Sequence, residues 1–226
     1  DPWPARMERL KQALSQCTTS LYDPDMEADE QIARFVHQTS QAGKRCLIIS
    51  KDKDFHQLVS ETVHLTVAAS SDLLYTPKEI EEEWGCPPEK VLFRRCIEGD
   101  SSDAIKGIPR FPKKLLPEVA NRVSSYKDLV ELFRNGGKGL SKPFTKAMGV
   151  KCWDAVTLPS HEYHAKYYVK KDKVTGTVTP TAPCPECEHP VVLRNYMLMN
   201  LKEEGKKPPI FMRNNRGDVT SILSLA

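Results

Sequence analysis

Apolar positions in the first part of the chain switch between helical and strand spacing. They recur at helical spacing over 6–14 and 27–41, which predicts two amphipathic helices, the second ended by Gly43. The run 46–49 is short and wholly apolar, the pattern of a strand covered on both faces in a parallel sheet. A helix followed by a buried strand indicates an α/β layered fold.

The middle of the chain predicts short helices separated by glycine and proline. Residues 99–112 hold several such breakers and are predicted to form a loop, so the helices on either side form a compact helical subdomain. The predicted elements are a helix over 55–59, a strand over 63–69, and helices over 76–84, 88–97, 113–123 and 126–133.

The last part of the chain has weaker periodicity. The glycines of 136–139 predict a flexible segment, and 152–189 is predicted to be irregular, with a hairpin around 174–178. A final helix is predicted over 191–204. We therefore expect an α/β core over 1–75, a helical subdomain over 76–135 and an irregular basic region over 136–226.

Composition excludes several classes of protein. The 226 residues are 39% hydrophobic, enough for a full core, yet no stretch approaches the roughly 20 apolar residues of a membrane helix. No signal peptide is visible and the seven cysteines are odd in number, so reduced thiols in the cytosol are expected rather than a secreted disulfide framework.

Charge is unevenly distributed along the chain. The net charge is only +3, but residues 1–104 carry 12 Lys and Arg against 19 Asp and Glu, and residues 105–226 carry 21 against 11. An acidic half attracts divalent metals and a basic half attracts a phosphate backbone, whereas uneven solvated surface is the simpler alternative.

Two acidic pairs stand at the ends of predicted elements in the first half. Glu27 and Glu30 lie one turn apart at a helix start, where the helix dipole alone favours acids. Asp52 and Asp54 directly follow the buried strand, at the carboxyl edge where α/β proteins place their sites, although a plain turn would also hold them.

Asp100 and Asp103 form a third pair between two helices, where Asp also serves as a cap. Three such pairs would repel one another if they clustered without cations between them. Hard oxygen ligands indicate Mg²⁺ or Mn²⁺ rather than zinc.

These motifs resemble the 5′ nuclease family, which includes flap endonucleases, phage 5′–3′ exonucleases and the 5′-nuclease domain of bacterial DNA polymerase I. Glu27-Ala-Asp-Glu is similar to the family's Glu-Ala-Asp-Asp helix, and Ile49-Ser-Lys-Asp-Lys-Asp-Phe to its strand-end Asp pair. Gly99-Asp-Ser-Ser-Asp-Ala-Ile-Lys-Gly-Ile resembles Gly-Asp-x-x-Asp-Asn-Ile-x-Gly-Val, and Leu193-Arg-Asn-Tyr-Met-Leu-Met-Asn-Leu resembles a late Arg-Asn-x-x-Leu-x-x-Leu helix. The resemblance covers about residues 5–134 and 191–201.

The resemblance implies a PIN-like parallel sheet flanked by helices, followed by a helix-hairpin-helix-like DNA-binding subdomain. It implies a structure-specific nuclease that hydrolyses DNA phosphodiesters in replication or repair with two Mg²⁺ or Mn²⁺ ions. Asp52, Asp54, Glu27 and Asp29 would be catalytic; Glu27, Asp29, Glu30, Asp52, Asp54, Asp100 and Asp103 would hold the metals, with Glu30 where the family has Asp.

The resemblance also implies a duplex-binding hairpin, at which family members often hold a monovalent cation such as K⁺. Its phosphate contacts would come from Lys106, Gly107, Arg110, Lys113 and Lys114. Arg110 and Pro112 replace glycines of the family's Gly-Ile-Gly-Pro-Lys pattern, and Pro112 also lacks an N–H donor.

The family's first strand, with one metal-binding Asp, and its arch, with another metal Asp, have no counterpart in this sequence. Asp1-Pro-Trp-Pro resembles the point just after that arch. We therefore expect the front end on another polypeptide or on a longer form of this one.

Cys184-Pro-Glu-Cys187 with His189 looks like half of a zinc site, and Cys152, His161 or His164 could supply the rest. A polar loop with free thiols is the alternative. Zinc, if bound there, would be structural.

Two other functions compete with the nuclease. One is a catalytically silent duplex-binding module whose acidic site is incomplete. The other is a PIN-like ribonuclease, which would share the acidic sheet edge but lack the hairpin near Gly107. A preference for duplex DNA over single-stranded RNA separates the nuclease from the ribonuclease.

Overall fold

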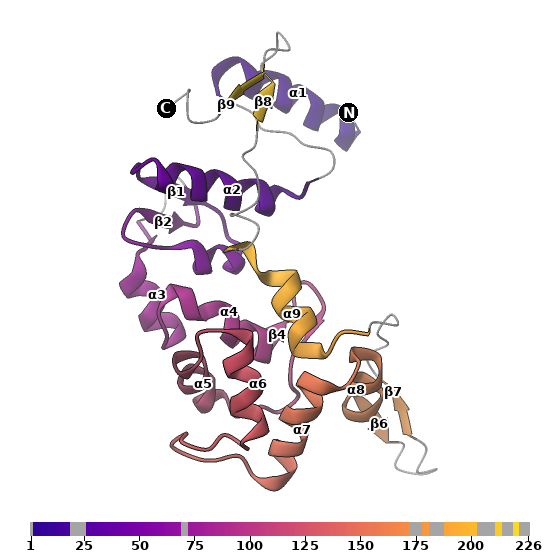
Figure 1. The fold of residues 1–226 in the computed structure, drawn as a ribbon. Helices are drawn as coiled ribbons and strands as arrows, with labels where there is room; N and C mark the ends of the chain where they lie inside the picture. Colours follow the sequence, from indigo (N-terminus) through magenta and orange to yellow (C-terminus); the bar gives the residue numbers. More distant parts are fainter. Residues whose placement is uncertain are drawn as a thin grey trace. The chain divides into compact units, whose positions relative to one another are not determined.

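The computed structural model describes residues 2–18, 26–68, 72–171, 178–180, 188–202, 211–213 and 219–221 (Figure 1). Contacts divide the chain into two compact units, one of residues 1–44 with 203–226 and one of residues 45–202. The division falls within the stretch that the sequence assigns to a single α/β core. Each unit is described by itself.

The smaller unit contains two helices and a two-stranded sheet. α1 (Trp3–Cys17) starts with proline in its first turn, and α2 (Ala28–Gln41) covers the predicted second helix almost residue for residue. β8 (Phe211–Arg213) pairs antiparallel with β9 (Val219–Ser221).

The larger unit begins with a three-stranded sheet. β1 (Cys46–Ile49) pairs in parallel with β2 (Val63–Thr66), and β2 pairs antiparallel with β3 (Leu74–Tyr75). Between β1 and β2 runs a 3-10 helix, η1 (Lys53–Leu58), where a short helix was predicted.

The prediction that β1 is covered on both faces is wrong for the described part of the chain. Ile48 is buried, but Leu47 is 55% exposed and Ile49 is 54% exposed. Side chains alternate between the two faces of a strand, so Leu47 and Ile49 point to the face opposite Ile48, and this face is exposed in the part of the chain that the structure describes.

Two proline-initiated helices follow the sheet. α3 (Pro77–Trp84) ends at Gly85, whose left-handed backbone (φ +66°) suits glycine, and α4 (Pro88–Glu98) comes next. α4 is buried on nearly all sides and contacts α3, α5, α9, η1 and β4, so it is the central element of this unit.

The predicted loop after α4 contains a small hairpin, β4 (Gly99–Asp100) paired with β5 (Ile105–Lys106). Its two ends pass so close that a Cβ on Gly99 would meet the backbone of Gly107, and a Cβ on Gly107 would meet the carbonyl of Ile97. Glycine is therefore required where the two chain segments cross.

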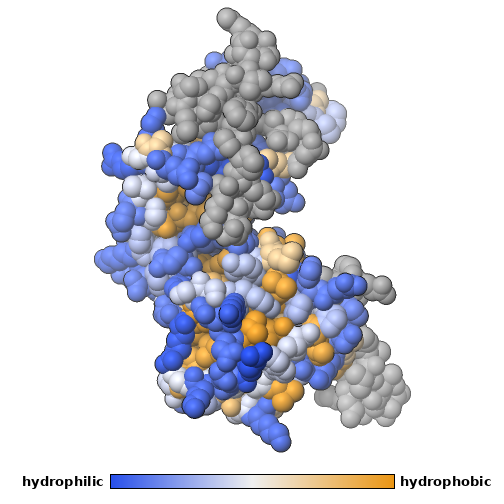
Figure 2. All heavy atoms as spheres, viewed as in Figure 1, coloured by the Kyte–Doolittle hydropathy of each residue, from blue (hydrophilic) through white to orange (hydrophobic). Residues whose placement is uncertain are grey.

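Helices cover the rest of this unit around one apolar core. η2 (Lys113–Leu115) runs into α5 (Leu116–Arg122), and α6 (Tyr126–Arg134) follows with Ser125 as its cap. Figure 2 shows apolar side chains emerging in the gaps between polar ones over these helices.

The prediction of irregular structure over 152–189 is wrong for residues 152–167. α7 (Lys146–Thr157) and α8 (Ser160–Tyr167) occupy this stretch. α7 contains Gly149 and Val150, which weaken periodicity and intrinsic helix propensity, but Thr145 caps it and Cys152 is fully buried on its inner face.

The chain then forms a hairpin and returns to the core. β6 (Val169–Lys171) pairs with β7 (Val178–Pro180), as the predicted hairpin requires, while the turn residues 172–177 lie outside the described residues. α9 (Val191–Met199) packs on α4 (Figure 1). Among the described residues, no helix is both long enough and apolar enough to span a membrane.

A buried histidine joins η1 to α3. Nδ1 of His56 accepts a hydrogen bond from the indole N–H of Trp84 at 2.7 Å, and its ring lies 4.8 Å from that of Tyr75. Burial lowers the pKa of His56 to about 4, so the ring is neutral at pH 7.

We expect this histidine to make folding sensitive to acid. The unfolded chain takes up a proton at His56 between about pH 6.5 and 4 that the folded chain does not, so stability falls as pH falls through this window. His56→Gln keeps a hydrogen-bond acceptor and should reduce the loss between pH 7 and 4.5 by about 2 kcal/mol.

Urea unfolding at a series of pH values measures this effect. His64→Gln, on the neighbouring β2, is the control and should keep the pH profile of the unaltered protein. Parallel profiles for His56→Gln and the unaltered protein would contradict the assignment.

Candidate active site

Two predicted acids lie at the carboxyl end of β1. Asp52 caps η1, and its Oδ1 accepts the backbone N–H of Asp54 at 2.9 Å. Asp52 is exposed, whereas Asp54 is buried. The cap turns the chain sharply after the strand, so the second carboxylate points into the protein instead of into solvent.

The β4–β5 hairpin carries the other pair in this unit. Oδ1 of Asp100 accepts the backbone N–H of Ser102 at 2.8 Å, and the hydroxyl of Ser102 donates to the same oxygen. Asp103 is exposed, and Ala104 after it has a left-handed backbone (φ +56°).

Arg95 of α4 joins the two pairs. Its Nη2 lies 2.6 Å from Oδ1 of Asp54, as an ion pair without the geometry of a hydrogen bond, and it donates a hydrogen bond to Oδ2 of Asp100. The arginine side chain is only 5% exposed. The structure thus brings acids from two separate elements to one guanidinium.

The sequence did not predict Arg95 as a site residue. The available signal was its place on the apolar face of its helix, three and four residues after Leu92 and Val91, which are both buried. A charged residue at such a position needs a buried partner.

The pKa values of Asp54 and Asp100 shift in opposite directions. The pKa of Asp54 is raised to about 6, mainly by burial; Arg95 lowers it, and the nearby charges of Asp52, Asp100 and Asp103 raise it. Burial also acts to raise the pKa of Asp100, but hydrogen bonds from Ser102 and the charge of Arg95 outweigh it, so this pKa is lowered. The two acids that Arg95 joins therefore differ in how readily they ionise.

The cluster opens into a cleft of about 780 Å³. Asp52, Asp100 and Asp103 line it with four cationic side chains, those of Lys51, Lys53, Arg94 and Arg95. Carboxylate oxygens without sulfur or imidazole suit a hard divalent cation, and the surrounding cations suit a phosphate.

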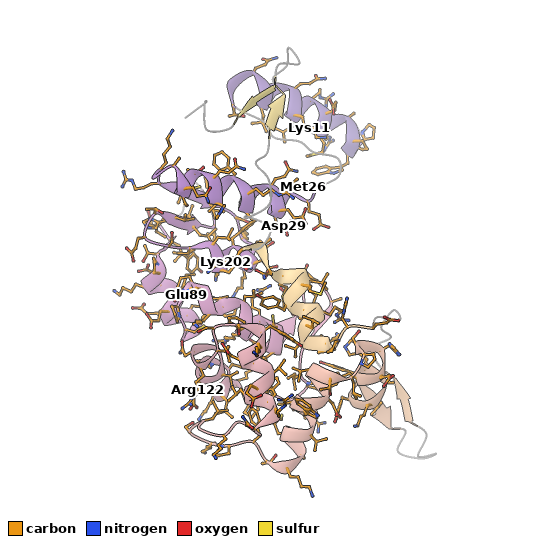
Figure 3. The ribbon with its side chains drawn as sticks, viewed as in Figure 1. Lys11, Met26, Asp29, Glu89, Arg122 and Lys202 are labelled. Atoms are coloured by element: carbon orange, nitrogen blue, oxygen red, sulfur yellow. The ribbon has the colours of Figure 1, made fainter. Side chains whose placement is uncertain are left out.

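The remaining predicted metal ligands belong to the smaller unit. Glu27 precedes α2 and is exposed, and Oδ1 of Asp29 accepts the backbone N–H of Glu30 at 2.8 Å. Figure 3 shows Asp29 at the start of α2. Over the described ranges, no three His, Cys, Asp or Glu side chains are arranged closely enough to hold a metal ion together.

The predicted DNA-binding residues lie along the chain that follows β4. Arg110 has a left-handed backbone (φ +61°), a conformation that favours glycine, and glycine is the residue that the family pattern has at this position. Lys113 and Lys114 are exposed, and Lys106 is half-buried.

The backbone around Gly107 is held from several sides. Asn195 of α9 donates to the carbonyls of Cys96 and Lys106, at 3.0 and 2.9 Å. The carbonyl of Gly107 accepts the Tyr168 hydroxyl at 2.8 Å. The sequence singled out the α9 motif containing Asn195 but did not predict this role.

Part of the predicted zinc set can be placed. Cys184 and Cys187 lie outside the described residues. Cys152 is fully buried in the core, and burial raises the pKa of its thiol to about 12. His189 is exposed, and its carbonyl accepts the N–H of Ser160 at 2.9 Å.

Residues 4–85 match the family model of the 5′-3′ exonuclease N-terminal resolvase-like domain. The chain is 31% identical over 122 residues to a 5′-3′ exonuclease of Buchnera aphidicola, covering 54% of this chain and 41% of that protein. It is 29% identical over 132 residues to a 5′-3′ exonuclease of Aquifex aeolicus, covering 58% and 45%. The chain thus spans less than half the length of these relatives.

Solved structures share the fold at low sequence identity. The bacteriophage T5 D15 protein co-crystallised with metal ions has a TM-score of 0.60 at 17% identity, covering 88% of this chain and 61% of that one. The T5 D15 flap endonuclease in a complex with DNA and metal ions has a TM-score of 0.61 at 14% identity, covering 88% and 58%. These findings show that residues 4–85 are similar to the N-terminal domain of 5′-3′ exonucleases and that the chain shares the fold of the T5 enzyme.

Proposed function

We infer that this chain belongs to a metal-dependent, structure-specific 5′ nuclease acting on branched, nicked or 5′-ended DNA in replication or repair. The observation that carries this proposal is that Asp52, Asp100 and Asp103, which surround the buried Asp54, line a cleft that also presents lysine and arginine. The negative charge of a phosphodiester in this cleft would be balanced by divalent cations on one side and by the lysine and arginine side chains on the other.

The donor set fits Mg²⁺ or Mn²⁺, and we propose two ions. Glu27, Asp29 and Glu30 are proposed as further metal ligands on the family resemblance alone. Bound there, the ions would supply polarisation of the scissile phosphate and activation of water. The chain's own task is to hold the carboxylates ionised and to orient the backbone. The raised pKa of Asp54 means that a bound cation would be needed to keep this group fully ionised near pH 6.

Replacing the two β1-end acids with their amides tests the nuclease directly. Asp52→Asn/Asp54→Asn should lower cleavage of a 5′-flap duplex in Mg²⁺ or Mn²⁺ at least about 100-fold, because amides are far weaker metal ligands. Glu89→Gln, an exposed acid on α4, is the matched control and should cut normally.

Outcomes separate the competing functions. Duplex binding in Ca²⁺ with no cutting by the unaltered chain in Mg²⁺ or Mn²⁺ would favour the catalytically silent module. Preferential binding and cutting of single-stranded RNA would favour the PIN-like ribonuclease.

For the duplex-binding surface we propose the helix-hairpin-helix-like segment from α4 to α6, with Lys106, Gly107, Arg110, Lys113 and Lys114 facing phosphates. The exposure of Lys113 and Lys114 beside the left-handed turn at Arg110 supports it. We also propose that this turn binds K⁺. Cys184, Cys187, His189 and Cys152 are proposed as the ligands of a structural Zn²⁺ ion.

Removing two of these charges should weaken DNA binding by a similar factor for every DNA sequence. We expect Lys113→Ala/Lys114→Ala to reduce the slope of log affinity against log salt by about 2, measured with a labelled duplex in Ca²⁺. Lys138→Ala, an exposed lysine after α6, is the control. An unchanged salt slope would remove these two lysines from the interface.

The open edge of β1 supports a further part of the proposal, that another segment or a second polypeptide adds a strand there. Cys46 and Ser50 donate their N–H groups to the β2 side, so by alternation those of Leu47 and Ile49 point to the open edge. Exposed Leu47 and Ile49 side chains give an added element apolar surface to cover.

Amide hydrogen exchange tests this edge. In the chain alone, the amides of Leu47 and Ile49 should exchange much faster than that of Ile48, and they should become protected in the longer protein or on addition of the second polypeptide. Protection of all three amides in the dilute chain alone would show that the edge is already covered.

A further inference from the structure

Arg95 is almost completely buried between two acids, so little water is available to solvate its charge. Its side chain is 5% exposed, and those of Asp54 and Asp100 are 11% and 13% exposed. An arginine in this position is stable only while its partners remain charged and close, because an unpaired buried guanidinium is costly.

The acid on the hairpin has both of its oxygens engaged. Oδ1 of Asp100 accepts from the N–H and hydroxyl of Ser102, and Oδ2 accepts from Arg95. Oδ1 of Asp54 faces the same guanidinium nitrogen. Any divalent ion at these oxygens therefore shares them with a cation that the protein already supplies.

We propose that Arg95 is a fixed cation of the carboxylate cluster. It is a positioning residue that holds the η1 and β4 acids together before any metal binds, and it competes with divalent ions for their oxygens. The part concerning divalent ions rests on the proposed function, whereas the part concerning position does not.

The adjacent arginine shows that this role is specific to one position. Arg94 lines the same cleft, but it pairs with Glu98 at 3.4 Å, donates to the carbonyl of Trp84, and lies 5.0 Å from the Trp84 ring. It therefore adds charge to the cleft without bridging the two acids, which makes it a matched control.

The experiment compares Arg95→Gln with Arg94→Gln by thermal unfolding in EDTA and by Mn²⁺ binding followed with electron paramagnetic resonance. In EDTA, Arg95→Gln should lower Tm by roughly 6–12 °C, because two buried carboxylates lose their counter-ion. Its Mn²⁺ affinity should rise about tenfold, because the competing cation is gone.

Mn²⁺ should also raise the Tm of Arg95→Gln by several degrees more than it raises that of Arg94→Gln or the unaltered chain, since the ion replaces the missing charge. Arg95→Lys keeps the charge and should keep the original Mn²⁺ affinity to within about threefold. This variant also serves if Arg95→Gln does not fold.

Several results would overturn the proposal. An unchanged Tm in EDTA would show that Arg95 does not hold the acids together. A Mn²⁺ affinity that falls in Arg95→Gln would show that the arginine shapes the site without competing for it. If the unaltered chain binds no Mn²⁺ and cuts no DNA, the nuclease proposal fails, but the loss of Tm in EDTA still tests the positioning role.

Discussion

Burial of α4 on nearly all sides is the constraint on which the larger unit depends. A helix that is covered all round must carry apolar residues on every face, and any charge on it must find a partner inside the protein. Here that charge is Arg95, and its partners come from the end of the sheet and from the next hairpin. Satisfying the buried charge of Arg95 therefore also brings the acids of the candidate site together.

The acidic cluster differs from an ordinary salt bridge because its carboxylates outnumber the cation that pairs with them. Among the described residues, only Arg95 pairs with Asp54 and Asp100, and Asp52, Asp100 and Asp103 all act to raise the pKa of Asp54. An excess of carboxylates in an open cleft lined by lysine and arginine is what links this geometry to phosphate chemistry.

Sequence patterns predicted the elements whose signals are local. Proline and glycine punctuation located α3 and α4, and the apolar run 46–49 located β1. The exposed face of β1 could not be predicted, because exposure depends on which elements pack on each face of the sheet and not on the apolar run itself. α7 was missed because its stability comes from packing of Cys152 and Ala155, not from periodicity.

The acids of the candidate site were predictable because they stand at element ends, next to motifs with fixed spacing. Arg95 was not predicted, because its place on the apolar face of its helix indicates a buried partner but not which acids supply it. The role of Asn195 depends on contacts across almost a hundred residues of sequence, and no local pattern reports such a contact.

That same contact bears on the order in which the molecule can assemble. The hairpin after α4 leaves its crossing carbonyls without a side-chain donor until α9 arrives, and Gln57 likewise donates to the carbonyl of Met199. During synthesis on a ribosome, Asn195 and Met199 appear roughly 90 to 140 residues after the segments that they contact, so these contacts are among the last that the larger unit can form. The hairpin that carries Asp100 and Asp103 therefore gains this support only when nearly all of the larger unit has been synthesised.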